Sequence, residues 1–134
     1  MTPDELSDRL WKFAARVGKV VNALPDTRLG RHVAGQLVRC GTAPGPNYDE
    51  GCAAESRADF AHKLSIALKE LKETRGWLKF CVIAELLNDK QIAPLLDEAE
   101  QLIRIRREFD HYREEQAACS FEMRNEQCSM SNLQ

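Results

Sequence analysis

Apolar residues in the first part of the chain recur at alternating steps of four and three residues. This spacing places them on one face of an α-helix and predicts a helix over residues 3–24. Thr2 is suited to cap this helix, Pro3 to its first position and Glu5 to a capping box, whereas Pro25 ends it. The apolar positions are Leu6, Leu10, Phe13, Val17, Val20 or Val21, and Leu24.

The same periodicity predicts three further helices, over residues 27–41, 56–87 and 92–115. Residues 41–47 interrupt the pattern, because two prolines and two glycines break or kink a helix there. We expect only a short turn to resume at residues 48–50. The apolar faces comprise Leu29, Val33, Leu37 and Cys40; then Phe60, Leu64, Ala67, Leu68, Leu71, Leu78, Cys81 and Val82; and finally Ile92, Leu95, Leu96, Ala99, Leu102, Ile103, Phe109 and Tyr112.

Four amphipathic helices joined by short connections predict an all-α fold, an antiparallel up-down-up-down four-helix bundle. A chain of 134 residues is long enough for one domain with a single core. We assign residues 1–116 to the bundle domain. Residues 117–134 lose the periodicity, and we expect them to form a flexible C-terminal tail.

Composition and charge narrow the classes of function. A net charge of −2 and a pI near 5.9 argue against a dedicated nucleic-acid binder, whose domains are usually strongly basic. The five cysteines show no CxxC spacing, which indicates reduced thiols in a cytoplasmic protein. The first residues lack the basic and apolar regions of a signal peptide, and no apolar stretch is long enough to span a membrane.

Several residues outside the predicted core are candidates for a subunit interface. Trp11 and Trp77 lie beside the apolar stripes of their helices, so each packs at the bundle edge or in an interface. Gly30, Ala34 and Gly35 leave little side chain on part of the second helix, where another helix can approach closely.

A basic stripe follows one side of the first helix, at Arg9, Lys12, Arg16 and Lys19. Such a stripe is suited to phosphate or to an acidic partner surface, although a solvated helix face is the simpler explanation. The last helix is acidic and is suited to complement this stripe on a neighbouring subunit. Any RNA binding carried by the stripe is expected to be weak and sensitive to salt.

Carboxylate and histidine pairs at the spacing of di-metal sites occur twice, in residues 59–62 and 108–111. His62 stands two residues from core residue Phe60, and His111 has the same relation to Phe109, so both histidines face away from the core. No nucleophile, base and orienting group occur together. We therefore expect no metal, no cofactor and no enzymatic activity, with a small-ligand or metal-dependent enzyme housed in the bundle as the alternative.

The segment from Gln36 to Leu78 resembles the four-helix-bundle family related to the 23S ribosomal RNA intervening-sequence proteins of bacteria. The string Glu55-Ser56-x-x-Asp59-Phe60-x-His62-Lys63-Leu64-Ser65-Ile66-Ala67-Leu68-Lys69-Glu70-x-x-Glu73-Thr74, with Trp77-Leu78 after it, carries the resemblance. It begins earlier, at Gln36, Leu37, Arg39, Gly41, Thr42, Gly45, Asn47, Tyr48 and Glu50. Pro44 and Pro46 depart from the family pattern, which concerns the local helix geometry.

The resemblance implies an up-down four-helix bundle that assembles into a homopentameric ring. It also implies genes that lie within intervening sequences of ribosomal RNA or stand alone. A related accessory protein of diversity-generating retroelements is basic and binds nucleic acid, whereas this chain is acidic overall. The family offers no catalytic residues to carry over.

The polar residues of the signature gather around the predicted kink and the start of the third helix. Capping and the satisfaction of backbone groups freed by the kink explain them without a ligand. They are Asn47, Glu50, Glu55, Ser56, Asp59 and Lys63. We therefore predict a bacterial, non-enzymatic, self-assembling protein that acts as a scaffold or accessory factor and binds RNA or a nucleoprotein weakly.

Overall fold

The structure is a computed structural model that describes residues 1–105 of the chain. It contains α1 (Pro3–Ala23), α2 (Arg28–Thr42), α3 (Pro44–Cys52), α4 (Arg57–Ile83) and a further helical segment over residues 89–105. Residues 1–103 form one compact unit; of a second unit, residues 104–134, the structure describes only residues 104 and 105. The rest of the last predicted helix and the predicted tail, 117–134, lie outside the described residues.

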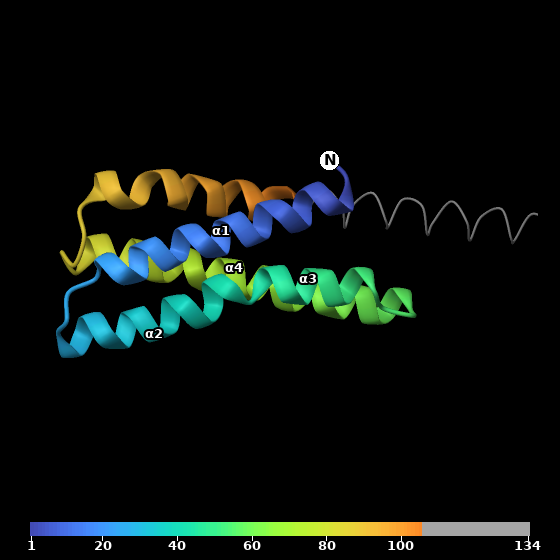
Figure 1. Ribbon diagram of the computed structural model, residues 1–134, viewed down its shortest axis with the longest axis horizontal. Coiled ribbons are helices and arrows are strands. Elements are labelled where there is room, and N and C mark those ends of the chain that lie inside the picture. The colour runs from blue at the N-terminus through green and yellow to red at the C-terminus, as the bar shows by residue number, and fades with distance from the viewer. Residues whose placement is uncertain (106–134) are drawn as a thin grey trace, which may run out of the picture. The chain divides into compact units, whose positions relative to one another are not determined.

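The predicted all-α bundle is confirmed. Within the first unit, α1, the arm formed by α2 and α3, α4 and the segment 89–103 run alternately in opposite directions (Figure 1). No strand occurs between residues 1 and 105. The helices meet over an apolar core that includes Leu6, Leu10, Phe13, Val17, Val20, Val33, Leu37, Cys40, Leu64, Ala67, Leu71, Leu78, Cys81, Ile92, Leu95, Ala99, Leu102 and Ile103.

Side-chain caps fix where three of the helices begin. The Thr2 hydroxyl accepts from the Glu5 amide at 3.2 Å, and the Glu5 carboxylate accepts from the Thr2 amide at 2.7 Å, which is the predicted capping box. Thr27 caps α2 by accepting from the Gly30 amide at 3.0 Å. Ser56 caps α4 by accepting from the Asp59 amide at 3.1 Å. These caps satisfy amides that have no partner within the helix.

The interruption at residues 41–47 is a junction between two helices rather than a break. Ala43 keeps right-handed helical angles, φ −78° and ψ −32°, and α3 begins at the next residue. Pro44 and Pro46 fit there because the first turn of a helix needs no amide donors. The expected short turn at residues 48–50 is therefore wrong, since α3 extends over Pro44–Cys52.

The end of α4 also differs from the prediction. The helix ends at Ile83 instead of residue 87, because Glu85 takes a left-handed conformation with φ 58°. The amides of Leu86 and Leu87 then turn back to the carbonyl of Cys81, at 2.9 and 3.3 Å. Glycine usually marks such an end in a sequence, and here no glycine does.

The last helical segment begins earlier than the predicted residue 92. The Asn88 side chain accepts from the Gln91 amide at 3.0 Å, and the Gln91 side chain accepts from the Asn88 amide at 3.1 Å. This reciprocal pair caps the segment, so helix starts at residue 89.

Leu29 was assigned to the apolar face of α2, and that assignment is wrong. Its side chain is 44 % exposed, because it lies in the first turn, at the end of the helix.

In contrast, Thr74 fills a gap in the apolar stripe of α4 that the sequence left open. Thr74 is fully buried, and its hydroxyl donates to the Glu70 carbonyl at 2.8 Å. A helix-internal acceptor therefore makes this buried hydroxyl tolerable in the core.

Candidate functional site

The predicted basic stripe lies on α1, but its first residue is already paired within the chain. Arg9 makes a two-point contact with Glu98, at 2.6 Å from Nε and 3.0 Å from Nη2, and also donates to Gln101 at 2.8 Å. The hydrogen bond to Glu98 raises the pKa of Arg9. The acidic last helix thus complements Arg9 in the same chain, the role that the sequence suggested between subunits.

The other three residues of the stripe are exposed. Lys12 pairs with Asp8 at 2.6 Å, but both side chains are largely in solvent, so the contact adds little stability. Among the described residues, no carboxylate lies within ion-pair distance of Arg16 or Lys19. These two side chains are the part of the stripe that remains available to an anion.

Trp11 joins α1 to α3 while leaving part of its ring in solvent. Its indole nitrogen donates to Asp49 at 2.8 Å, and Ser7 donates to the same carboxylate at 2.5 Å. A Cβ added at Gly45 would lie 3.1 Å from the ring, so glycine allows the close contact. The side chain is nevertheless 47 % exposed. Trp11 therefore packs at the bundle edge and still offers apolar surface to a neighbour.

The three small residues proposed as an interface on α2 are not equivalent. Gly30 is buried, and a Cβ there would lie 2.0 Å from the Pro25 carbonyl oxygen, so it serves the turn before the helix. Ala34 is half-buried, and Gly35 is exposed with open space around it. Val38 follows one turn after Ala34 and is 44 % exposed. The outer face of α2 therefore combines small residues with an uncovered apolar side chain.

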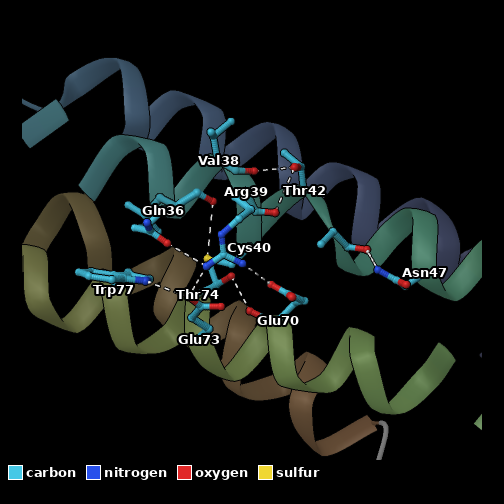
Figure 2. A network of polar contacts seen from close by, with 12 residues as sticks. Gln36, Val38, Arg39, Cys40, Thr42, Asn47, Glu70, Glu73, Thr74 and Trp77 are labelled. Atoms are coloured by element: carbon cyan, nitrogen blue, oxygen red, sulfur yellow. Dashed lines mark hydrogen bonds and ion pairs between the residues drawn. The ribbon is translucent and has the colours of Figure 1, made fainter. Parts of the chain in front are cut away.

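An ion-pair network joins α2 to α4 (Figure 2). The Arg39 guanidinium reaches Glu70 at 3.3 Å, bonds Glu73 at closer range and donates to Gln36 at 2.9 Å. The hydrogen bond with Glu73 is the main reason for the raised pKa of Arg39. Sequence reasoning missed this network, although Arg39, Glu70 and Glu73 all belong to the family signature.

Trp77 extends the same network on the side of α4 next to α2. Its indole nitrogen donates to Glu73 at 3.4 Å, and Figure 2 shows the ring at the edge of the network. The ring meets His32 and Phe80 edge-to-face, with centroids 5.9 and 5.6 Å apart. Trp77 is half-buried, so it packs within the chain and keeps an accessible part.

Most polar residues of the signature have structural contacts. The Asn47 side chain donates to the Ala43 carbonyl at 2.9 Å, across the α2–α3 junction. Glu50 pairs with Lys63 at 2.7 Å instead of with the backbone, and so links α3 to α4. Ser56 is the cap of α4, and Asp59 lies in its first turn. The remaining member, Glu55, is exposed in the preceding turn.

The residues considered for metal binding or catalysis do not converge within the described part of the chain. Asp59 and His62 are exposed, and residues 1–105 contain no group of three metal-ligating side chains. The second pair, residues 108–111, lies outside the described residues. Burial raises the pKa of the Cys40 and Cys81 thiols, which keeps them protonated and poorly nucleophilic.

Tyr48 is a buried side chain that the sequence did not mark as core. Its burial, with the neighbouring Cys52 thiol, raises the pKa of the phenol well above its ordinary value. The ring therefore acts as an uncharged part of the contact between α3 and the rest of the bundle.

The helices that carry these contacts are also the part of the chain that is similar to known proteins. Residues 6–107 match the family model of the 23S rRNA-intervening sequence protein. The chain belongs to this family. A solved structure from Bacteroides thetaiotaomicron, of a protein with unknown function from the S23 ribosomal protein family, has the same fold with a TM-score of 0.71. It is 31 % identical over 75 % of this chain and 94 % of the other. No curated protein matches the sequence.

Proposed function

We propose that this intervening-sequence protein is a non-enzymatic, self-assembling scaffold or accessory factor of the bacterial cytoplasm. Its working form is a closed ring of five copies, with weak RNA or nucleoprotein binding as a secondary property. The observation that carries this proposal is the uncovered apolar surface on two neighbouring helices, at Trp11 on α1 and Val38 on α2. Contiguous exposed apolar surface marks sites of protein association, and on this proposal Trp11 and Val38 each belong to such a patch.

A closed ring requires that one surface patch meets a different patch on the next copy. Trp11 is one candidate patch, and the outer face of α2 at Ala34, Gly35 and Val38 is the other. The aromatic ring supplies a large apolar contact, whereas the small residues let a neighbouring backbone approach closely. This assignment uses the interface candidates that the sequence suggested, without Gly30, which is buried in its own turn.

Substitution of Trp11 tests the assembly. Trp11→Glu places a charge where a desolvated contact is proposed and should reduce the mass of the assembly. Lys12→Glu is the matched control, since Lys12 is the next residue along α1 and is largely exposed. A mass unchanged by Trp11→Glu removes Trp11 from the interface, and a reduced mass in both variants shows that the effect is general charge repulsion.

The proposed RNA binding on α1 depends on Arg16 and Lys19, the exposed cations without a carboxylate partner in the described residues. It should be weak because the chain carries a net charge of −2, which a ring of five multiplies. Arg16→Glu with Lys19→Glu should weaken binding at low salt. Binding that resists this change, or that is tight at physiological salt, contradicts the proposal.

The alternative of a small-ligand or metal-dependent enzyme has no supporting contact in residues 1–105. Metal analysis of the purified chain tests it, and a stoichiometric metal would favour it.

A further inference from the structure

A shallow hollow with aromatic walls lies on the surface of α4, beside its contacts with α2. It has a volume of about 390 Å³ and is lined by Glu73, Gly76, Trp77 and Phe80. Gly76 leaves its floor open, because a Cβ added there would meet nothing within 4 Å. Trp77 and Phe80 stand nearly perpendicular, at 88°, so together they offer both a ring face and a ring edge to an occupant.

Three lysines of α4 lie on the same side of the helix as Gly76, at one edge of this hollow. Lys69, Lys72 and Lys79 precede or follow Gly76 by seven, four and three residues, spacings that keep side chains on one side of a helix. All three are exposed. No carboxylate of the described residues lies within ion-pair distance of any of them. Their positive charge is therefore available to a partner.

The acidic residues beside the hollow offset these charges only in part, because the four cations Lys69, Lys72, Lys79 and Arg39 face the two carboxylates of Glu70 and Glu73 and leave a net charge of +2. The Glu73 carboxylate is held by the Arg39 guanidinium from α2, and it accepts from the Trp77 indole at 3.4 Å. Glu70, the other carboxylate on this side of α4, pairs with Arg39 at 3.3 Å. These two carboxylates and the Trp77 ring, which meets His32, lie on the side of α4 next to α2, whereas the exposed lysines lie on the adjoining side, with Gly76.

We infer that this surface binds single-stranded nucleic acid, with an unpaired base seated in the hollow against Trp77 or Phe80. The phosphates on either side of that base would lie near Lys69, Lys72 and Lys79. Aromatic rings flanked by cations are the usual platform for unpaired bases, because every base has a flat face that stacks. This platform is distinct from the α1 stripe, which lies on another helix.

Charge decides between this occupant and a second copy of the chain. An interface with another copy would have to bury three unpaired ammonium groups, which is unfavourable without matching carboxylates. A cationic ligand is disfavoured by the same lysines. A flexible polyanion with aromatic bases satisfies both the charge and the shape of the surface.

Binding of an oligouridylate of about 12 nucleotides, a length within the usual range for single-strand sites, is the first test. Lys69→Gln, Lys72→Gln and Lys79→Gln together should weaken binding at least about tenfold at low salt and lower the salt slope by about two. The matched control removes the same charge at exposed helix ends, with Arg28→Gln, Arg57→Gln and Lys90→Gln. It should change affinity less than about threefold. Equal losses in the two triple variants would overturn the inference.

A second test separates stacking from charge. Phe80→Leu and Trp77→Leu should each weaken binding of the oligouridylate at least about fivefold, the effect of losing one stacking ring. An RNA duplex with the same number of nucleotides should bind the wild-type chain no more tightly than the single strand binds these variants. In a Trp11→Phe background, the oligouridylate should quench the fluorescence of Trp77, a readout that needs no destabilising change at the site. Absence of quenching, or equal affinity for duplex and single strand, refutes the platform.

The mass of each variant distinguishes this inference from the proposed assembly. The lysine triple variant should keep the assembly mass of the wild type. A reduced mass would identify the α4 surface as a subunit interface and overturn its assignment to nucleic acid. Loss of binding in Arg16→Glu with Lys19→Glu, with the α4 variants unaffected, would place RNA on α1 alone and also overturn it.

Discussion

Replacing Gly41 by alanine tests the closest approach between α1 and α2. A Cβ at this position would lie 2.6 Å from Cγ1 and 2.9 Å from Cγ2 of Val17. Val17 is fully buried, and its β-branched side chain has one strongly preferred rotamer in a helix. The added methyl group therefore has to displace either the Val17 side chain or the two helices.

The size of the effect follows from two opposing contributions. Overpacking a well-filled core costs about 1–3 kcal/mol, whereas alanine is favoured over glycine within a helix by about 0.8–1 kcal/mol. Gly41→Ala should thus lower the free energy of unfolding by up to about 2 kcal/mol. Gly18→Ala is the matched control on the facing helix α1, since its Cβ meets nothing within 4 Å. It should raise the free energy of unfolding by about 0.8 kcal/mol.

Urea unfolding followed by far-ultraviolet circular dichroism measures both variants, at one fixed chain concentration because assembly adds to apparent stability. Val17→Ala removes the obstructing methyl groups, so combining it with Gly41→Ala should give a favourable coupling of about 0.5 kcal/mol or more. A Gly41→Ala variant as stable as Gly18→Ala, or a double variant without coupling, would contradict the proposed clash with Val17.

Two other predictions concern the end of α4 and the buried phenol. Glu85 has φ 58°, a conformation that costs a residue with a side chain about 1–2 kcal/mol, so Glu85→Gly should stabilise the chain by about 0.5–1 kcal/mol in the same urea assay. An unchanged or lower midpoint would contradict this. Burial raises the pKa of Tyr48 above its ordinary value of 10.0, so its contribution is complete below pH 10 and is lost as the pH rises above 10. Tyr48→Phe should therefore lose less stability than the wild type between neutral and strongly alkaline pH, and identical pH profiles would disprove the assignment.

The sequence predicted those features of the fold that depend on local chemistry. The start of α1 follows from Thr2, Pro3 and Glu5, whose capping contacts involve only neighbouring residues. The end of α4 did not follow, because its left-handed residue is Glu85 and no glycine announces it. Similarly, Pro44 suggested a break, whereas the backbone of the preceding residue continues the helix into α3.

The candidate surfaces were less predictable, because side-chain partners come from distant parts of the chain. Nothing near Arg9 in the sequence shows that Glu98 will neutralise it, as these residues meet only after the bundle forms. Gly30 has the composition of an interface residue, yet it serves a turn that closes onto Pro25. Hydrophobic periodicity reports which face of a helix is buried and carries no information on which charges pair across helices.

The proposed assembly of this chain is a ring of five. Sedimentation velocity or light scattering of the wild-type chain at micromolar concentration measures its mass most directly. We expect one dominant species of about 76 kDa, five copies of a 15.2 kDa chain in a closed ring. A dominant species at the mass of one or two chains would contradict it.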